Sequence, residues 1–96
     1  MKIKQTEKYE GQDWWNWSVW IEGNNVDNVA KVTWKLHPTF PQPEREISDP
    51  RTKFKLDSAG WGTFVVKADV LLKDGTKQEL EHELELHYPD GTITQR

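Results

Sequence analysis

Apolar and polar residues alternate with a period of two along most of this chain. The clearest run spans residues 30–36, where one face holds Ala30, Val32, Trp34 and Leu36. Faces of the same kind are formed by Trp17, Val19 and Ile21; by Phe54 and Leu56; by Phe64, Val66, Ala68, Val70 and Leu72; and by Leu80, His82, Leu84, Leu86 and Tyr88. No stretch has an apolar stripe with the helical period of about 3.6 residues. The pattern therefore predicts half-buried β-strands throughout.

About seven or eight short strands in so short a chain favour two packed antiparallel sheets. We therefore predict a single domain over residues 1–96, folded as an all-β, immunoglobulin-like sandwich. Prolines 41, 43 and 50 cannot donate hydrogen bonds within a sheet, which confines residues 41–49 to a loop or an edge strand.

The register of the late strands predicts a specific turn. A two-residue loop at Asp74-Gly75 would put core and acidic residues on one face, whereas a loop of residues 73–75 pairs Leu72 with Thr76 and keeps the inward faces together. We therefore expect Gly75 in the left-handed region, forming a bulge. Residues 89–91 repeat this chemistry and are expected to lead into a short last strand over residues 92–95.

Composition and charge narrow the classes of partner. The chain of 96 residues has 13 basic and 16 acidic side chains, a net charge of −3 and no cysteine. This balance disfavours direct nucleic-acid binding and excludes disulfides and thiolate metal sites. No segment predicts a membrane span or a signal peptide. We expect a soluble intracellular protein, cytoplasmic if prokaryotic and nuclear if eukaryotic, alone or within a larger protein or complex.

Motifs for catalysis are absent from the sequence. His82 and His87 have opposite strand parity, so they are not expected to bind one metal together, and His82 is expected to be a hydrogen-bonded core residue. No nucleophile and base have a recognisable spacing, and no phosphate-binding loop is present. Four alternating glutamates, at positions 79, 81, 83 and 85, form either a solvated strand face or a docking surface for a basic partner. We expect no enzyme, cofactor or metal.

The six tryptophans divide by parity. Trp17 and Trp34 point inward and are expected in the core. Trp14 and Trp15 are adjacent, so in a strand they point to opposite sides, and one of them is a candidate ligand contact. Trp61 lies between Gly60 and Gly62, where its ring and its backbone N–H are accessible. An exposed ring of this size predicts a ligand contact.

Two aromatic turns are candidate binding loops. Residues 36–40 read Leu-His-Pro-Thr-Phe and residues 60–64 read Gly-Trp-Gly-Thr-Phe. Binding residues concentrate on turns held by a rigid scaffold. If the two turns face each other, their rings form the walls of a narrow slot for a flat group.

These turns, in their order and spacing, resemble the signature of the YEATS domain family. The resemblance covers most of residues 14–88, including Trp-Ser-Val-Trp-Ile-Glu-Gly at 17–23, Val-Ala-Lys-Val-Thr-Trp-Lys-Leu at 29–36 and Glu-Leu-Glu-Leu-His at 83–87. The compact length and the tryptophan-rich start are most similar to the prokaryotic branch of the family.

The resemblance implies an immunoglobulin-like reader of acylated lysine, such as acetyl- or crotonyl-lysine, in a modified peptide or protein. On this chain, Phe40 and Trp61 match the two rings that sandwich the acyl group. Thr39 matches the hydroxyl residue that contacts the acyl amide, and His37 the residue that orients it. The backbone N–H of Trp61 matches the donor to the acyl carbonyl. Gly60 and Gly62 match the small positions beside the ligand.

The chain departs from the family pattern at two points, and two other classes of binding remain open. The segment between Pro43 and Gly60 is slightly longer, so we expect the loop that frames the slot to differ. The family has a further aromatic residue near the position of Asp13, where Trp14 or Trp15 is close enough to substitute. If the chain is prokaryotic, the resemblance does not give the partner. A carbohydrate-binding sandwich would use exposed tryptophans as an open platform, and a protein-interaction module would have no acyl-lysine activity. Stacking on single-stranded nucleic acid fits the acidic charge poorly.

Overall fold

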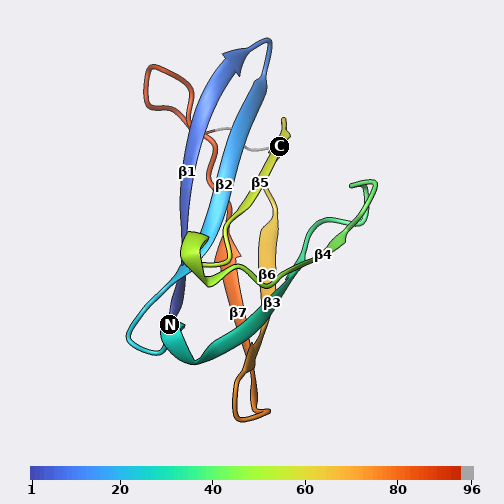
Figure 1. Ribbon diagram of the computed structural model, residues 1–96. Coiled ribbons are helices and arrows are strands. Elements are labelled where there is room, and N and C mark those ends of the chain that lie inside the picture. The colour runs from blue at the N-terminus through green and yellow to red at the C-terminus, as the bar shows by residue number, and fades with distance from the viewer. Residues whose placement is uncertain (94–96) are drawn as a thin grey trace.

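Seven strands form two antiparallel sheets in the computed structural model, which describes residues 1–93 (Figure 1). The strands are β1 (Lys2–Gly11), β2 (Trp14–Glu22), β3 (Val29–Lys35), β4 (Glu44–Ile47), β5 (Leu56–Gly60), β6 (Val65–Leu72) and β7 (Lys77–Glu83). Two short 3-10 helices, η1 (Val26–Asn28) and η2 (Pro50–Thr52), lie in connections. One sheet has the order β1-β2-β5 and the other β4-β3-β6-β7, which is the predicted two-sheet sandwich.

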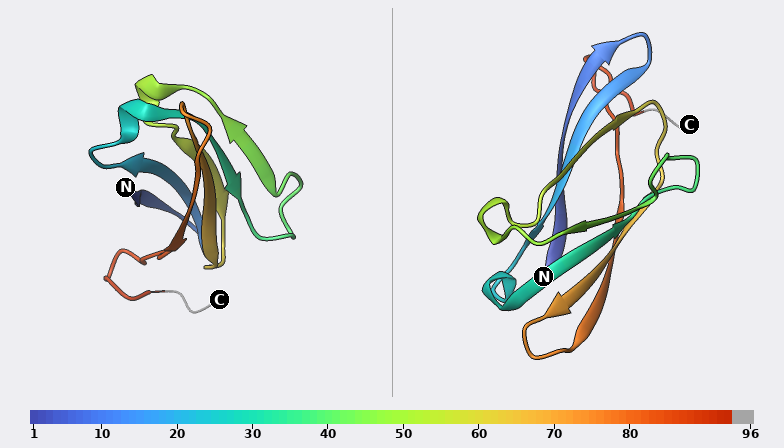
Figure 2. Two further views of the ribbon diagram at one scale, coloured as in Figure 1. Left: turned by 90° about the horizontal axis from the view of Figure 1, so that it is seen from below. Right: turned by 45° about the vertical axis from the view of Figure 1, so that its right-hand side comes forward.

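The core lies between the inner faces of the two layers, which Figure 2 shows from two further directions. Most of the predicted inward residues are buried, and they include Trp17, Val19, Ile21, Val32, Trp34, Leu56, Val66, Ala68, Val70, Leu84 and Leu86. Trp17 and Trp34 are 2% and 0% exposed, so their predicted core positions are confirmed.

One predicted inward residue is wrong. Ala30 is exposed, whereas its neighbour Val29 is buried. The pairing of β3 with β6 shifts between Val29 and Lys31, and this irregularity reverses the parity at the start of the strand. Because a bulge inserts one residue into the ladder, strict alternation extended back from Val32 selects the wrong neighbour.

The predicted turn after β6 is confirmed. The N–H of Leu72 donates to the carbonyl of Thr76 at 2.8 Å, and Gly75 has a φ of 90°. Ala68 pairs with Leu80, as the register argument requires. The second turn of this type ends at Gly91, which has a φ of 92°.

Only the first part of the predicted last strand falls within the described residues. Ile93 forms an isolated bridge with His87, and residues 94 and 95 of that strand lie outside the part of the chain that is described. The proline-rich segment behaves as predicted, because β4 is the edge strand of its sheet and loops flank it on both sides. Phe54, assigned to a strand face by alternation, is buried but precedes β5 and has a φ of 60°.

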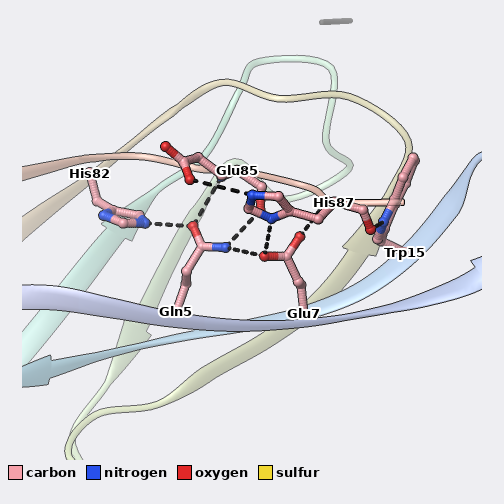
Figure 3. A network of polar contacts seen from close by, with 6 residues as sticks. All are labelled: Gln5, Glu7, Trp15, His82, Glu85 and His87. Atoms are coloured by element: carbon pink, nitrogen blue, oxygen red, sulfur yellow. Dashed lines mark hydrogen bonds and ion pairs between the residues drawn. The ribbon is translucent and has the colours of Figure 1, made fainter. Parts of the chain in front are cut away.

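The sequence pattern did not predict β1, whose inward positions between Ile3 and Tyr9 are polar. Figure 3 shows how these polar side chains join β1 to the chain after β7. The amide of Gln5 donates to the carbonyl of Glu85 at 2.7 Å and accepts from its N–H at 3.0 Å. Glu7 accepts from the N–H of His87 at 2.6 Å and contacts its Nδ1 at 3.0 Å. Side chains thus hold together two sheet edges that share no backbone ladder.

His82 belongs to the same network, so its predicted hydrogen-bonded role is confirmed. Its Nε2 lies 2.7 Å from the side-chain oxygen of Gln5. Partial burial holds the pKa of His82 below its usual value, although Glu85 and Glu83 act in the opposite direction. β7 ends at Glu83, so the alternation of a strand does not continue as far as His87. His87 therefore faces β1, as His82 does. No group of residues within 1–93 is arranged to hold a metal ion.

The strand directions bring three connections to one end of the sandwich. The β1–β2, β3–β4 and β5–β6 connections lie at the end opposite the β6–β7 turn (Figure 1). The candidate binding residues lie in these connections or in the strand residues directly beside them. Within residues 1–93, no helix has the length and apolar character needed to cross a membrane.

Candidate functional site

A cavity of about 440 Å³ lies between the two aromatic turns. Its lining consists of Trp14, His37, Thr39, Phe40, Pro41, Ala59, Gly60, Trp61, Gly62, Thr63 and Phe64. The fold therefore brings together seven of the eight residues predicted as site residues, from the start of β2, the β3–β4 connection, and the end of β5 with the connection that follows it. The exception is Trp15.

A tight turn after β3 fixes the positions of His37, Thr39 and Phe40. The N–H of Phe40 donates to the carbonyl of His37 at 3.0 Å, and the N–H of Thr39 donates to His37 Nδ1 at 3.3 Å. Thr39 Oγ1 lies 2.9 Å from the same nitrogen. Because Nδ1 accepts from the backbone N–H, the Thr39 hydroxyl also acts as a donor to it. The lone pairs of the hydroxyl oxygen are then available to a donor in the cavity.

The ring of Phe40 is the fixed wall of the cavity. It packs at a tilt on Phe64, with centroids 5.3 Å apart, and edge-on to Trp17, with centroids 6.3 Å apart. The guanidinium carbon of Arg45 lies 6.0 Å from the Phe40 centroid. Aromatic pairs at such separations are favourable beyond the area that they bury. Phe40 is therefore held from behind before any ligand binds.

Two exposed tryptophans border the cavity. Trp61 is 55% exposed and Trp14 is 44% exposed. Large apolar side chains at this exposure are candidates for contact with another molecule. Trp61 comes from the β5–β6 connection, and Trp14 begins β2.

Trp15 does not join the site. It is fully buried, and its indole N–H donates to the carbonyl of His87 at 2.8 Å. Its ring packs against Tyr9 and Tyr88, with centroids 5.0 and 4.9 Å away. Trp15 is therefore a core residue, and of the two adjacent tryptophans only Trp14 borders the cavity.

The β1–β2 turn determines which tryptophan reaches the cavity. Gly11, Gln12 and Asp13 all have positive φ, between 54° and 95°. The Tyr88 hydroxyl donates to Asp13 Oδ1 at 2.6 Å, and the N–H of Asp13 donates to the Tyr9 hydroxyl at 3.2 Å. Asp13 therefore ties the turn to the body of the sandwich.

Four further lining residues were not among the predicted site residues: Pro41, Ala59, Thr63 and Phe64. Alternation assigned Phe64 to the core, and it does pack on Trp17 with centroids 5.9 Å apart. A ring at the end of the sandwich belongs to both the core and the cavity. Its place at the end of the second turn was the available signal.

The cavity is aromatic and lacks charged carboxylates and ammonium groups. Its lining residues include no aspartate, glutamate, lysine or arginine. The polar groups are the His37–Thr39 pair, Thr63 and backbone groups. An open platform of tryptophans, as a carbohydrate-binding module would use, is not assembled. Trp15 is buried, and Trp20 is half-buried with its indole N–H bonded to Glu22 at 3.0 Å.

A β-sandwich that holds an uncharged aromatic cavity between loops at one end has the form of a ligand-binding module. The family model described as the prokaryotic YEATS domain matches residues 15–85. The chain belongs to this family.

The chain is also similar in sequence to curated AF-9 proteins. The AF-9 homologue of Saccharomyces cerevisiae is 31% identical over 78 residues, which are 74% of this chain and 34% of the relative. Human AF-9 is 30% identical over 79 residues, which are 75% of this chain and 14% of the relative. The chain thus spans about a third of the length of the yeast relative and a smaller share of the length of the human one.

Solved structures of the family share the fold. The Yaf9 YEATS domain in a structure described as recognising an H3K122suc peptide has a TM-score of 0.68 and 26% identity, covering 88% of this chain and 69% of that one. The yeast AF-9 homologue Yaf9 has a TM-score of 0.70 and 24% identity, covering 91% and 65%.

Proposed function

We propose that this chain is a non-catalytic module that binds an acylated lysine side chain of a peptide or protein in the cavity between residues 37–41 and 59–64. The observation that carries the proposal is the aromatic cavity in which Thr39, oriented by His37, lies beside Phe40 and Trp61. Support also comes from the Yaf9 YEATS domain, whose structure is described as recognising an H3K122suc peptide.

The chemistry of the cavity matches an acyl-amide. Acylation removes the lysine charge and leaves a flat group with one N–H donor and one carbonyl acceptor. The Thr39 hydroxyl oxygen is available to accept from the N–H, and the backbone N–H of Trp61 is the proposed donor to the carbonyl. Pairing both groups avoids the cost of about 1–3 kcal/mol for each buried polar group left unpaired. The aromatic walls add stacking of about 0.5–1.5 kcal/mol for each ring.

Discrimination against unmodified lysine follows from the same lining. An ammonium group would have to leave water for a cavity without a carboxylate. Burying an unpaired charge is strongly unfavourable. The module is therefore expected to bind acylated peptides and to reject the same peptide with a free amine.

Calorimetric titration with acetyl-, crotonyl- and unmodified-lysine peptides tests the proposal. We expect binding of the acylated peptides only. Trp61→Ala should lower affinity at least about tenfold through lost stacking and burial. Thr39→Val should lower it by about tenfold because the amide N–H loses its acceptor.

Matched controls separate the site from general effects on the fold. Val65→Ala removes exposed apolar surface next to the cavity, and Thr6→Val removes an exposed hydroxyl on β1. Neither should change affinity. Equal binding of all three peptides, or an unchanged affinity in Trp61→Ala, would overturn the proposal.

A further inference from the structure

Trp17 has a polar atom that the rest of the fold does not use. Its side chain is 2% exposed, and its indole N–H has no hydrogen-bond partner among the described residues. The other fully buried tryptophans are satisfied, because Trp15 donates to the carbonyl of His87 and Trp34 to that of Phe54. An unpaired buried donor is unfavourable and is uncommon in folded proteins. The N–H of Trp17 therefore calls for an explanation.

The free N–H lies close to Gly60, which lines the cavity, although Trp17 itself is not among the lining residues. Gly60 pairs with Trp15 in the β2–β5 ladder, so a side chain at this position would point inward, as Trp15 does. A Cβ atom built on Gly60 would lie 3.9 Å from Trp17 Nε1 and 3.8 Å from Phe40 Cζ. A group that takes the place of this Cβ atom is therefore in ordinary contact with both the Phe40 ring and the indole N–H.

We propose that the Trp17 N–H binds a hydrogen-bond acceptor on the distal part of the ligand's acyl chain, which makes hydroxyacyl-lysines the preferred ligands of this module. The inference rests on the proposed function. In that function Thr39 and the Trp61 N–H already pair with the two polar groups of the amide, so a third donor has no partner in a plain acetyl or butyryl chain. An oxygen further along the chain gives it one.

The lining also selects the charge of that acceptor. No lysine or arginine lines the cavity, so a terminal carboxylate would be buried against a single neutral donor. A hydroxyl costs less to bury and accepts one hydrogen bond. A neutral 3-hydroxybutyryl group is therefore favoured over a succinyl group.

A pair of peptides that differ by one oxygen atom tests the inference. Calorimetry compares butyryl-lysine with 3-hydroxybutyryl-lysine, and a ¹H–¹⁵N spectrum follows the indole resonance of Trp17. We expect about three- to tenfold tighter binding of the hydroxylated peptide, the gain typical of one hydrogen bond. The Trp17 resonance should shift downfield with that peptide and much less with the butyryl one.

Two variants make the test specific. Gly60→Ala places a methyl group at ordinary contact distances, 3.8 and 3.9 Å, between Phe40 and the indole N–H. Trp17→Phe removes the donor and retains an aromatic ring in the core, and its folding is checked by thermal denaturation. In each variant the ratio of the two affinities should fall to about one, because the N–H is covered or absent.

The outcomes separate this inference from the proposed function. Equal affinities with an unmoved Trp17 resonance would overturn the inference and mean that the N–H faces a neighbouring ring, such as that of Phe64. The proposed function would stand in that case if Trp61→Ala still abolished binding. Tighter binding of succinyl-lysine than of the hydroxylated peptide would overturn the preference for a neutral group. Binding of neither the butyryl nor the 3-hydroxybutyryl peptide would overturn the inference, and the proposed function would fall with it only if the acetyl and crotonyl peptides also failed to bind.

Discussion

At the scale of single residues, the pair Trp14 and Trp15 shows how strand geometry divides chemistry between core and site. Successive side chains of a strand point to opposite faces. Trp15 is fully buried with its N–H satisfied, whereas Trp14 is 44% exposed at the edge of the cavity. Identical neighbours therefore lie in separate environments, one in the core and one at the edge of the cavity.

Substituting each tryptophan in turn should separate a role in stability from a role in binding. We expect Trp15→Ala to lower the free energy of unfolding by about 3–5 kcal/mol, the usual cost of deleting a buried large aromatic side chain. Trp14→Ala should change stability by less than about 0.5 kcal/mol, as exposed substitutions do. It should weaken binding of an acylated peptide several-fold. Denaturant unfolding and calorimetry measure the two effects, and a reversed pattern would contradict the assignment.

The sequence could predict most residues of the site but not this division. His37, Thr39, Phe40 and the Gly60–Gly62 turn were predicted from their spacing and from the family resemblance. Parity alone could not choose between Trp14 and Trp15, because the choice depends on the β1–β2 turn. Three successive residues with positive φ, held by hydrogen bonds to tyrosines 9 and 88, determine which of the two tryptophans points into the core. Contacts between residues so distant in the chain leave no local signal.

At the scale of secondary structure, the turns set the register of the late strands. The turn after β6 places Gly75 at a φ of 90° and keeps Ala68 opposite Leu80. A one-residue slip would move the apolar face of β7 to solvent. The register is therefore determined jointly by the turn and by the inward residues.

Replacing Gly75 tests how much the turn after β6 contributes to stability. Nothing lies within 4 Å of the position of its Cβ, so any cost of Gly75→Ala comes from the backbone. We expect a loss of about 1–2 kcal/mol in unfolding free energy, the cost of left-handed backbone for a residue with a Cβ. Gly75→Asn should cost less, because asparagine tolerates this region. A Gly75→Ala variant as stable as the parent protein, measured by urea denaturation, would argue against the strained turn.

Alternation predicted the strands with apolar inner faces and missed β1. Its inward Gln5 and Glu7 are polar because they face backbone and histidine groups rather than core side chains. A polar residue on an inner face is indistinguishable by sequence from one in a loop. The bulge at Val29 was not predicted either, because one inserted residue reverses the parity of the strand without changing its composition.

At the scale of the whole molecule, the two sheets meet along a seam of side-chain hydrogen bonds. We define the seam as Gln5 and Glu7 of β1 with Glu85 and His87 of the segment after β7 (Figure 3). Gln5 supplies both a donor and an acceptor to one residue's backbone, as a ladder neighbour would. The seam therefore satisfies backbone groups at an edge that has no partner strand.

Breaking the seam should affect stability without affecting binding. Glu7→Ala leaves the His87 N–H without its acceptor, so we expect the unfolding free energy to fall by about 1–3 kcal/mol. Affinity for an acylated peptide should stay unchanged, because Glu7 does not line the cavity. Glu10→Ala, on the outer face of the same strand, is the control and should be close to neutral. A loss of affinity in Glu7→Ala would mean that the seam and the cavity are coupled.

The glutamates that alternate along β7 are expected to oppose pairing of this sheet with a second copy of the chain. β7 is the last strand of its sheet, and Glu79, Glu81 and Glu83 are all exposed. An edge strand is a template for pairing with another molecule and so a starting point for aggregation. Two β7 edges brought together in antiparallel fashion would set carboxylates against carboxylates, which is repulsive. We therefore expect the charge pattern, which contributes nothing to the core, to oppose extension of the exposed edge into an intermolecular sheet.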